Sequence, residues 1–128
     1  MLANSRVCAD IAVRELGAAR RFYENVLGLA VDYEDADRGI YYRAGGGTMI
    51  NLYQRDVDPG EQAVATFLVD DIDTAMRGLR DCGVPFTDYD EPDLKTRDGV
   101  FEDGTGFRVA WFKDAAGNVL SLEQLATG

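Results

Sequence analysis

The chain has 128 residues, of which 46% are hydrophobic and 28% charged, a composition typical of one soluble globular domain with its own core. Its 13 Lys and Arg against 23 Asp and Glu give a net charge of -10 at pH 7, which disfavours contact with phosphate backbones, so no nucleic-acid partner is expected. No apolar run approaches the roughly 18 to 20 residues of a membrane helix, and residues 1–6 lack the pattern of a signal peptide, so we expect a cytoplasmic protein with no membrane partner.

The first half of the chain predicts the element order βαβββ. Polar and apolar residues alternate over residues 6–13, as in a strand whose two faces differ. Apolar residues then recur at helical spacing over residues 17–27, and Gly28 is a typical helix stop. Three short strands are predicted at residues 30–34, 40–44 and 48–54, and the glycines at 45–47 indicate a hairpin turn between the last two.

The second half repeats this order after a polar connector at residues 55–61. A strand is predicted at residues 63–69, and Asp71 caps a helix whose apolar stripe ends before Gly83. Residues 88–103 hold seven acidic and two basic residues, which indicates either a mobile flap or a solvated loop. Further strands are predicted near residues 85–89, 107–113 and 119–125.

The two halves also align with each other residue by residue. An offset of 56 pairs Val13 with Val69, and an offset of 70 pairs residues 47–54 with residues 117–124. Self-similarity of this kind indicates an internal duplication.

The duplication leads to a predicted α+β fold. A single domain, residues 1–128, contains two βαβββ modules at about residues 5–55 and 62–126. One helix covers only one face of a four-stranded sheet, so the opposite face is free to surround a ligand. The predicted architecture is two curved mixed sheets around a concave cleft, with the helices on the outer face.

Three segments of the chain resemble the vicinal oxygen chelate superfamily, which includes glyoxalase I, extradiol dioxygenases, fosfomycin-resistance enzymes and bleomycin-resistance proteins. The first runs from Val-Arg-Glu-Leu to Phe-Tyr-Glu-Asn-Val-Leu-Gly-Leu over residues 13–29. The others are Val-Asp-Asp-Ile-Asp at residues 69–73 and Phe-Lys-Asp-Ala-Ala-Gly-Asn-Val-Leu at residues 112–120. The segments occur in order on the duplicated frame, and the resemblance, which covers nearly the whole chain, implies the fold of that superfamily.

The resemblance also implies where a metal would bind. In metal-using members of the superfamily, four side chains on the concave face, usually His and Glu, hold the ion. The matching positions here are Cys8, Asn51, Val64 and Ser121, and the chain contains no His. A thiol, an amide, a hydrocarbon and a hydroxyl are a poor ligand set for hard and soft ions alike. No resident metal and no other cofactor is therefore expected.

The same strands supply the predicted ligand-binding residues. Asn51 and Ser121 either hydrogen-bond a ligand or are satisfied within the protein, and Cys8 is better explained as a small buried residue than as a nucleophile. The candidates that face the predicted cleft are Cys8, Asp10, Asn51, Tyr53, Val64, Trp111, Ser121 and Glu123. Of these, Asp10, Asn51 and Glu123 form the one alternative set of oxygen ligands for a metal.

For two pairs of neighbouring aromatic residues, the sequence leaves open which member faces the cleft. Because neighbouring residues of a strand face opposite ways, one member of Tyr41/Tyr42 and one of Trp111/Phe112 should face the cleft and the other the helix. The alternation does not tell which.

Two classes of function fit this pattern. The first is a metal-independent protein that binds and sequesters a small organic ligand, such as an antibiotic or aromatic metabolite, as the resemblance to bleomycin-resistance proteins implies. The second is a lyase, isomerase or dioxygenase of the same superfamily with non-standard site residues. The missing ligand set favours the first class, the negative charge fits a cationic ligand, and the resemblance implies a homodimer.

Overall fold

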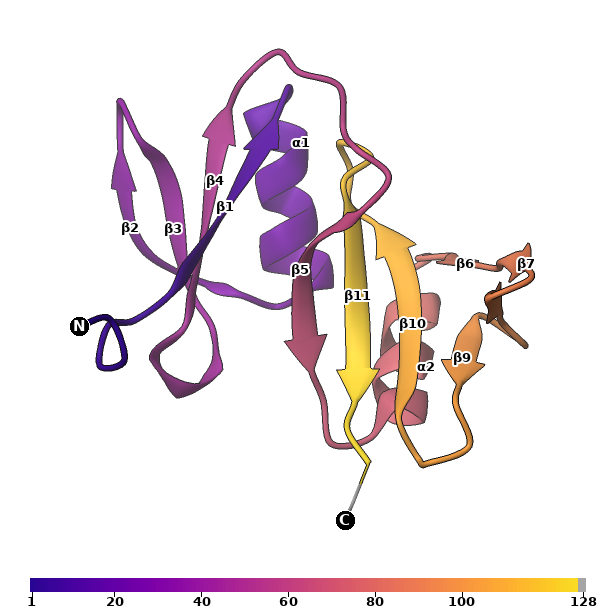
Figure 1. The fold of residues 1–128 in the computed structure, drawn as a ribbon. Coiled ribbons are helices and arrows are strands. Elements are labelled where there is room, and N and C mark those ends of the chain that lie inside the picture. Colours follow the sequence, from indigo (N-terminus) through magenta and orange to yellow (C-terminus); the bar gives the residue numbers. More distant parts are fainter. Residues whose placement is uncertain (127–128) are drawn as a thin grey trace. The chain divides into compact units, whose positions relative to one another are not determined.

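Each half of the chain folds into its own mixed sheet with a helix packed on one face (Figure 1). The computed structural model describes residues 1–126, which divide into a first unit, Met1–Pro59, and a second unit that begins at Gly60. No helix among these residues is long and apolar enough to cross a membrane. Two α-helices and two mixed sheets among these residues confirm the predicted α+β class.

The first unit contains a four-stranded sheet in the order β1-β4-β3-β2, in which β1 lies parallel to β4 and the other pairs are antiparallel. The predicted helix is present but changes its hydrogen-bonding pattern midway, where the α-helix continues as a π-helix. The elements are β1 (Cys8–Val13), α1 (Leu16–Arg21), η1 (Phe22–Val26), β2 (Ala30–Asp35), β3 (Gly39–Arg43), the short turn η2 (Gly45–Gly47) and β4 (Met49–Gln54).

The core of the first unit lies between this sheet and its helix. Leu52 is the register partner of both Ile11 and Ile40, and all three are at most 2% exposed. Tyr42 packs on the helix side, where its ring stacks on that of Tyr23 with centroids 6.2 Å apart. Tyr42 is therefore the core member of the pair Tyr41/Tyr42, and Tyr41 lies on the opposite face of β3.

The second unit repeats this layout with additions. Its main sheet has the order β5-β11-β10-β6, and β9 also pairs with β10. As predicted, Asp71 caps the helix, because its carboxylate accepts hydrogen bonds from the backbone N–H groups of Asp73 and Thr74. The elements are β5 (Ala63–Leu68), α2 (Ile72–Asp81), β6 (Phe86–Thr87), β7 (Asp90–Glu91), β8 (Leu94–Lys95), β9 (Val100–Glu102), β10 (Arg108–Lys113) and β11 (Val119–Gln124).

The acidic segment at residues 88–103 differs from its prediction as a flap or loop. It contains β7, β8 and β9, which are only two or three residues long. The Asp88 carboxylate accepts hydrogen bonds from the Thr96 hydroxyl at 2.7 Å and the Gly99 N–H at 2.8 Å, and so joins the two ends of the β7–β8 excursion. Strands this short show no period in the sequence, so composition alone could not reveal them.

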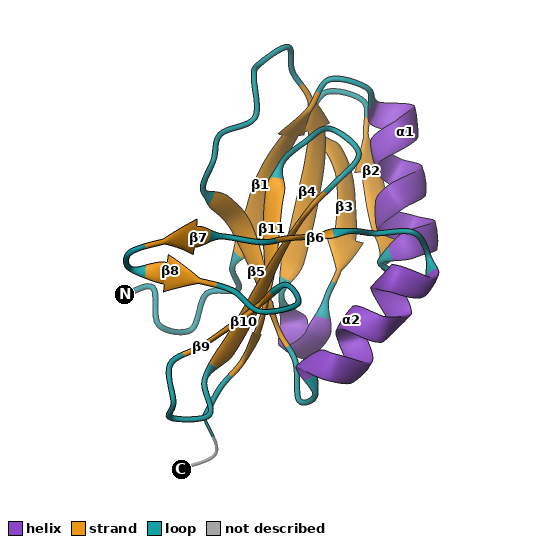
Figure 2. Ribbon diagram, turned by 90° about the vertical axis from the view of Figure 1, so that its right-hand side faces the viewer, coloured by secondary structure: helices purple, strands orange, loops and turns teal. Residues whose placement is uncertain are grey.

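In each unit the helix lies on one side of its own sheet (Figure 2). In the second unit, Phe112, Leu120 and Leu122 face α2 and are at most 4% exposed. The register then places Trp111 and Ser121 on the opposite face, which settles the second aromatic pair: Phe112 belongs to the core.

Candidate functional site

The face of each sheet opposite its helix, called the helix-free face below, carries most of the predicted site residues. In the first unit, the register aligns Asp10 of β1 with Asn51 of β4, Asn51 with Tyr41 of β3, and Tyr41 with Tyr33 of β2. The rings of Tyr33 and Tyr41 stack with centroids 4.4 Å apart. We call these four residues the first row.

Asn51 is the most buried member of the first row. It is only 6% exposed, and its Nδ2 donates to the Arg38 carbonyl at 3.1 Å and to the Asp10 carboxylate at 3.4 Å. Within residues 1–126, its Oδ1 is buried and receives no hydrogen bond. A buried acceptor without a donor lowers the stability of the fold. The two hydrogen bonds of Nδ2 hold the amide in this orientation although its Oδ1 is unsatisfied.

Cys8 lies beside the first row, at one end of β1. Burial, followed by the negative charge of Asp10, raises the pKa of the Cys8 thiol above its ordinary value, and the sulfur lies 3.9 Å from the Asp10 carboxylate. A protonated thiol is a weak nucleophile and a weak metal ligand. The half-buried Cys8 therefore has no activated thiolate.

A corresponding row crosses the helix-free face of the second unit. Thr66 of β5 is the register partner of Ser121 of β11, and Ser121 is the partner of Trp111 of β10. The Thr66 and Ser121 hydroxyls lie 2.7 Å apart, and the Tyr89 ring meets the Trp111 ring edge-on with centroids 5.2 Å apart. We call Thr66, Ser121, Trp111 and Tyr89 the second row.

The two rows are equivalent under the duplication. The offset of 56 converts Asp10 to Thr66 and Tyr33 to Tyr89, and the offset of 70 converts Asn51 to Ser121 and Tyr41 to Trp111. Each row therefore consists of a polar residue on the edge strand, a buried polar residue on the next strand and two touching aromatic rings.

Three predicted site residues lie outside the rows. Val64 is 43% exposed and has no register partner, because the pairing of β5 with β11 shifts there by one residue; the register partner of Ser121 is Thr66. Glu123 follows Ser121 by one strand period, on the same face. Tyr53 follows Asn51 in the same way and lines a cavity of about 520 Å³ in the first unit.

Three functional candidates, Tyr33, Thr66 and Tyr89, were missed by the sequence reasoning; Tyr33 lies in the strand predicted at residues 30–34 and is recognised only by its stacking on Tyr41. The offset of 56 that matched Cys8 with Val64 also matches Asp10 with Thr66, so the signal for Thr66 was available. Tyr89 lay where the strand predicted near residues 85–89 overlaps the segment interpreted as a flap or loop, and only the tertiary contact with Trp111 reveals its place.

The residues at the four metal positions of the resembled superfamily do not fit a metal ion. The Cys8 thiol is held protonated, the Asn51 N–H groups donate to protein oxygens, and the Ser121 hydroxyl is engaged by Thr66. The fourth position, Val64, has no ligand atom. Among residues 1–126, no three His, Cys, Asp or Glu side chains form a group that could hold an ion.

Comparison with solved structures finds many chains of similar fold. A member of the glyoxalase/bleomycin resistance protein/dioxygenase superfamily from Sphaerobacter thermophilus DSM 20745 aligns with a TM-score of 0.75 and 25% identity, over 98% of this chain and 100% of that one. A lactoylglutathione lyase from Agrobacterium tumefaciens aligns with a TM-score of 0.73 and 16% identity, over 97% and 96% of the two chains. An oxidase named ChaP-H2 aligns with a TM-score of 0.72 and 23% identity, over 98% and 97%.

The sequence itself identifies the family. Residues 6–122 match the family model described as the glyoxalase/bleomycin resistance protein/dioxygenase superfamily. The chain therefore belongs to this superfamily, as its resemblance implied. Comparison with curated proteins gives no significant match.

Proposed function

We propose that this protein is a metal-independent binding protein for a small organic molecule, with an antibiotic or an aromatic metabolite as the kind of ligand. The observation that carries the proposal is the repeated row, in which two touching aromatic rings adjoin a buried polar group on the helix-free face of each unit. Aromatic walls with a few placed polar groups are the usual composition of small-molecule sites.

The exposed members of the rows are the ones that would contact the ligand. Tyr33 is 49% exposed, and the Asp10 and Thr66 side chains are also accessible. Asn51 and Ser121 are almost fully buried and hold Asp10 and Thr66 in position by hydrogen bonds. A flat ligand would stack on the aromatic rings, and Asp10 would favour a cationic group on it.

Membership of the superfamily leaves an enzyme as the alternative, since its structural relatives include a lactoylglutathione lyase and an oxidase. A lyase, isomerase or dioxygenase reaction would need a general base, a nucleophile or a metal at the rows. The Cys8 thiol with its raised pKa and the Thr66–Ser121 hydroxyl pair do not supply an activated group. The donor chemistry of the rows thus favours binding over catalysis.

A ligand screen with row variants tests the proposal. Antibiotics and aromatic metabolites are screened by thermal melting, and each hit is titrated while the fluorescence of Trp111, the only tryptophan, is followed. We expect Tyr33→Leu or Ser121→Ala to weaken binding of a hit. Asp32→Asn, an exposed neighbour of Tyr33 outside the rows, serves as the control. A hit that binds the Tyr33 and Ser121 variants as tightly as wild type would refute the site.

We also propose that the protein is a homodimer. Edge strands β1 and β5 each have one unpaired side within residues 1–126, and Val64 and Leu68 of β5 are 43% and 66% exposed. An exposed apolar edge strand is a common site of association. Light scattering at micromolar concentration should give twice the mass of the chain, and a monomer mass would reject this assembly.

A cytoplasmic location completes the proposal. Cys8 and Cys82 are both free thiols, which suits a reducing compartment. Fractionation of cells that express the full chain should recover it with cytoplasmic markers, and recovery outside the cytoplasm would contradict this location.

A further inference from the structure

A second candidate site lies in the second unit, on the side of its helix. A cavity of about 790 Å³ is bounded by α2, by the acidic segment at residues 88–103 and by Arg108 of β10. Its volume lies within the range of small-molecule sites. Of the residues of the second row, only Tyr89 lines it.

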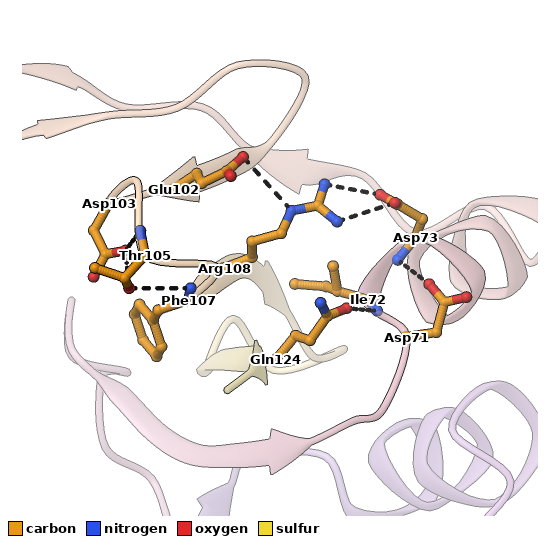
Figure 3. A network of polar contacts seen from close by, with 9 residues as sticks. All are labelled: Asp71, Ile72, Asp73, Glu102, Asp103, Thr105, Phe107, Arg108 and Gln124. Carbon is orange, nitrogen blue, oxygen red and sulfur yellow. Dashed lines mark hydrogen bonds and ion pairs between the residues drawn. The ribbon is translucent and has the colours of Figure 1, made fainter. Parts of the chain in front are cut away.

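One wall of the cavity is fixed by a network around Arg108 (Figure 3). The Arg108 guanidinium donates two hydrogen bonds of 3.0 Å to the Asp73 carboxylate of α2. Its Nε lies 3.9 Å from the Glu102 carboxylate of β9, and it is buried without a hydrogen-bond acceptor among the described residues. Arg108 therefore ties α2 to β9, and its own charge is already offset.

The other three cations of the cavity form no ion pair among the described residues, although the pKa of Asp88 is lowered by the hydrogen bonds it accepts and further by the charge of Arg80. Lys95 and Arg97 line it and form no ion pair within residues 1–126. Arg80 donates to the Asp98 carbonyl at 2.8 Å and lies over the Phe86 ring at 5.2 Å, so its guanidinium is oriented without being paired.

The acidic groups of the cavity form no ion pair with Lys95 or Arg97 in the described part of the chain. Asp73 and Glu102 are engaged by Arg108, and Asp90, which is the register partner of Lys95, and Asp98 are both exposed. The local charge of the lining thus balances, whereas the whole chain carries -10. Ammonium and guanidinium groups present only N–H donors, so their natural partners are the oxygens of an anion.

We propose that this cavity binds a small organic acid, that is, an apolar or aromatic body carrying a carboxylate or phosphate group. Lys95 and Arg97, assisted by Arg80, would bind the anionic group, and Met76, Tyr89 and Val100 provide the less polar wall for the body of the ligand. The inference does not depend on the function proposed for the rows, because none of its charged residues belongs to them.

Three probes with one aromatic ring each test the inference: phenyl phosphate, benzyl alcohol and benzylammonium. Each is titrated into the isotope-labelled full chain while backbone amide shifts are followed by NMR. We expect saturable binding of phenyl phosphate with the largest shifts at Thr96, Gly99 and Val100, and weaker binding of the neutral and cationic probes. Equal or tighter binding of benzyl alcohol or benzylammonium would overturn the proposal.

Matched variants then test which cations bind the anionic group of the probe. Lys95→Gln/Arg97→Gln removes the two unpaired cations, and we expect it to weaken phenyl phosphate binding roughly fivefold or more. Arg77→Gln, on the exposed part of the same helix α2 and outside the cavity, should leave the affinity unchanged. Unchanged affinity in the double variant, or an equal loss in Arg77→Gln, would refute the assignment. Largest shifts at Ser121 and Thr66 would place the probe on the second row and not in this cavity.

Discussion

The assignment of faces to strand β4 can be tested by two neighbouring truncations. Leu52 is fully buried between Ile11 and Ile40 on the helix side, whereas Tyr53 is half-buried on the helix-free face and makes no side-chain hydrogen bond among the described residues. Leu52→Ala removes buried carbon from the centre of a three-strand apolar layer, so it should lower the free energy of unfolding by about 3 to 4 kcal/mol. Tyr53→Ala loses only part of a side chain's burial and should cost roughly 1 kcal/mol.

Urea unfolding of both variants, followed by far-UV circular dichroism, measures this contrast. For a chain of this length the loss in Leu52→Ala corresponds to a melting temperature lower by roughly 11 to 15 °C, and the denaturant slope should be unchanged. Tyr53→Ala should melt close to wild type. If Tyr53→Ala proved as destabilising as Leu52→Ala, the two faces of β4 would be exchanged and the first row would be wrongly placed.

Three further outcomes follow from individual contacts. Tyr42→Phe removes a hydroxyl that donates to the Glu24 carboxylate at 2.9 Å in the core of the first unit, so chemical denaturation should show a loss of about 1.5 kcal/mol, and no loss would show that the bond contributes nothing. The hydrogen bonds from Arg108 lower the pKa of Asp73, so the stability it adds, roughly 0.5 to 1 kcal/mol for this exposed group, is fully present above about pH 4 and is lost as the pH falls below that value. The stability difference between wild type and Asp73→Asn should therefore vanish in acid, and a difference that grows there would contradict this ion pair. Added zinc, nickel, manganese or iron(II) should leave the melting temperature unchanged, whereas an ion bound only to the native state at 100 times its dissociation constant would add about 2.7 kcal/mol; such a rise would refute the metal-free interpretation.

The strands, helices and faces were largely predictable from the sequence because they depend on local periodicity. In β1, Ile11 and Val13 are buried and Asp10 is exposed, as the alternation of apolar and polar residues along the chain predicts. The Asp71 cap and the stop at Gly83, whose φ is +86°, are likewise local signals.

The details of the site were less predictable because they depend on pairing between distant segments. Val64 was assigned to the fourth metal position by its match with Cys8, but the pairing of β5 with β11 shifts at Val119/Leu120 and leaves Val64 without a register partner. Tyr89 joins the second row only through its contact with Trp111, which no local pattern encodes. Strand periodicity specifies a face, whereas irregular pairing decides which residues on it become neighbours.

The two rows are equivalent in position but not in charge, and this difference predicts where a cationic ligand binds. The edge strand of the first row carries the Asp10 carboxylate, 3.4 Å from the Asn51 amide, whereas the second row has the uncharged Thr66 at the equivalent position. An exposed carboxylate in the same row as two stacked Tyr rings, with Asn51 between them, attracts a cation by charge, and the ring faces add to the attraction.

Asp10→Asn should therefore weaken a cationic aromatic ligand roughly threefold to fivefold at low salt. The effect should shrink in high salt, because exposed charges are screened within about 8 Å at physiological ionic strength and more strongly above it. Thr66→Val removes a hydroxyl of similar exposure without changing charge, so it should leave the salt dependence of binding unaltered. Calorimetric titration of the same ligand into wild type and both variants at two salt concentrations separates these effects. If Thr66→Val abolished the salt dependence while Asp10→Asn bound as wild type, the cation would belong to the second row, and the charge of Asp10 would have no part in recognition.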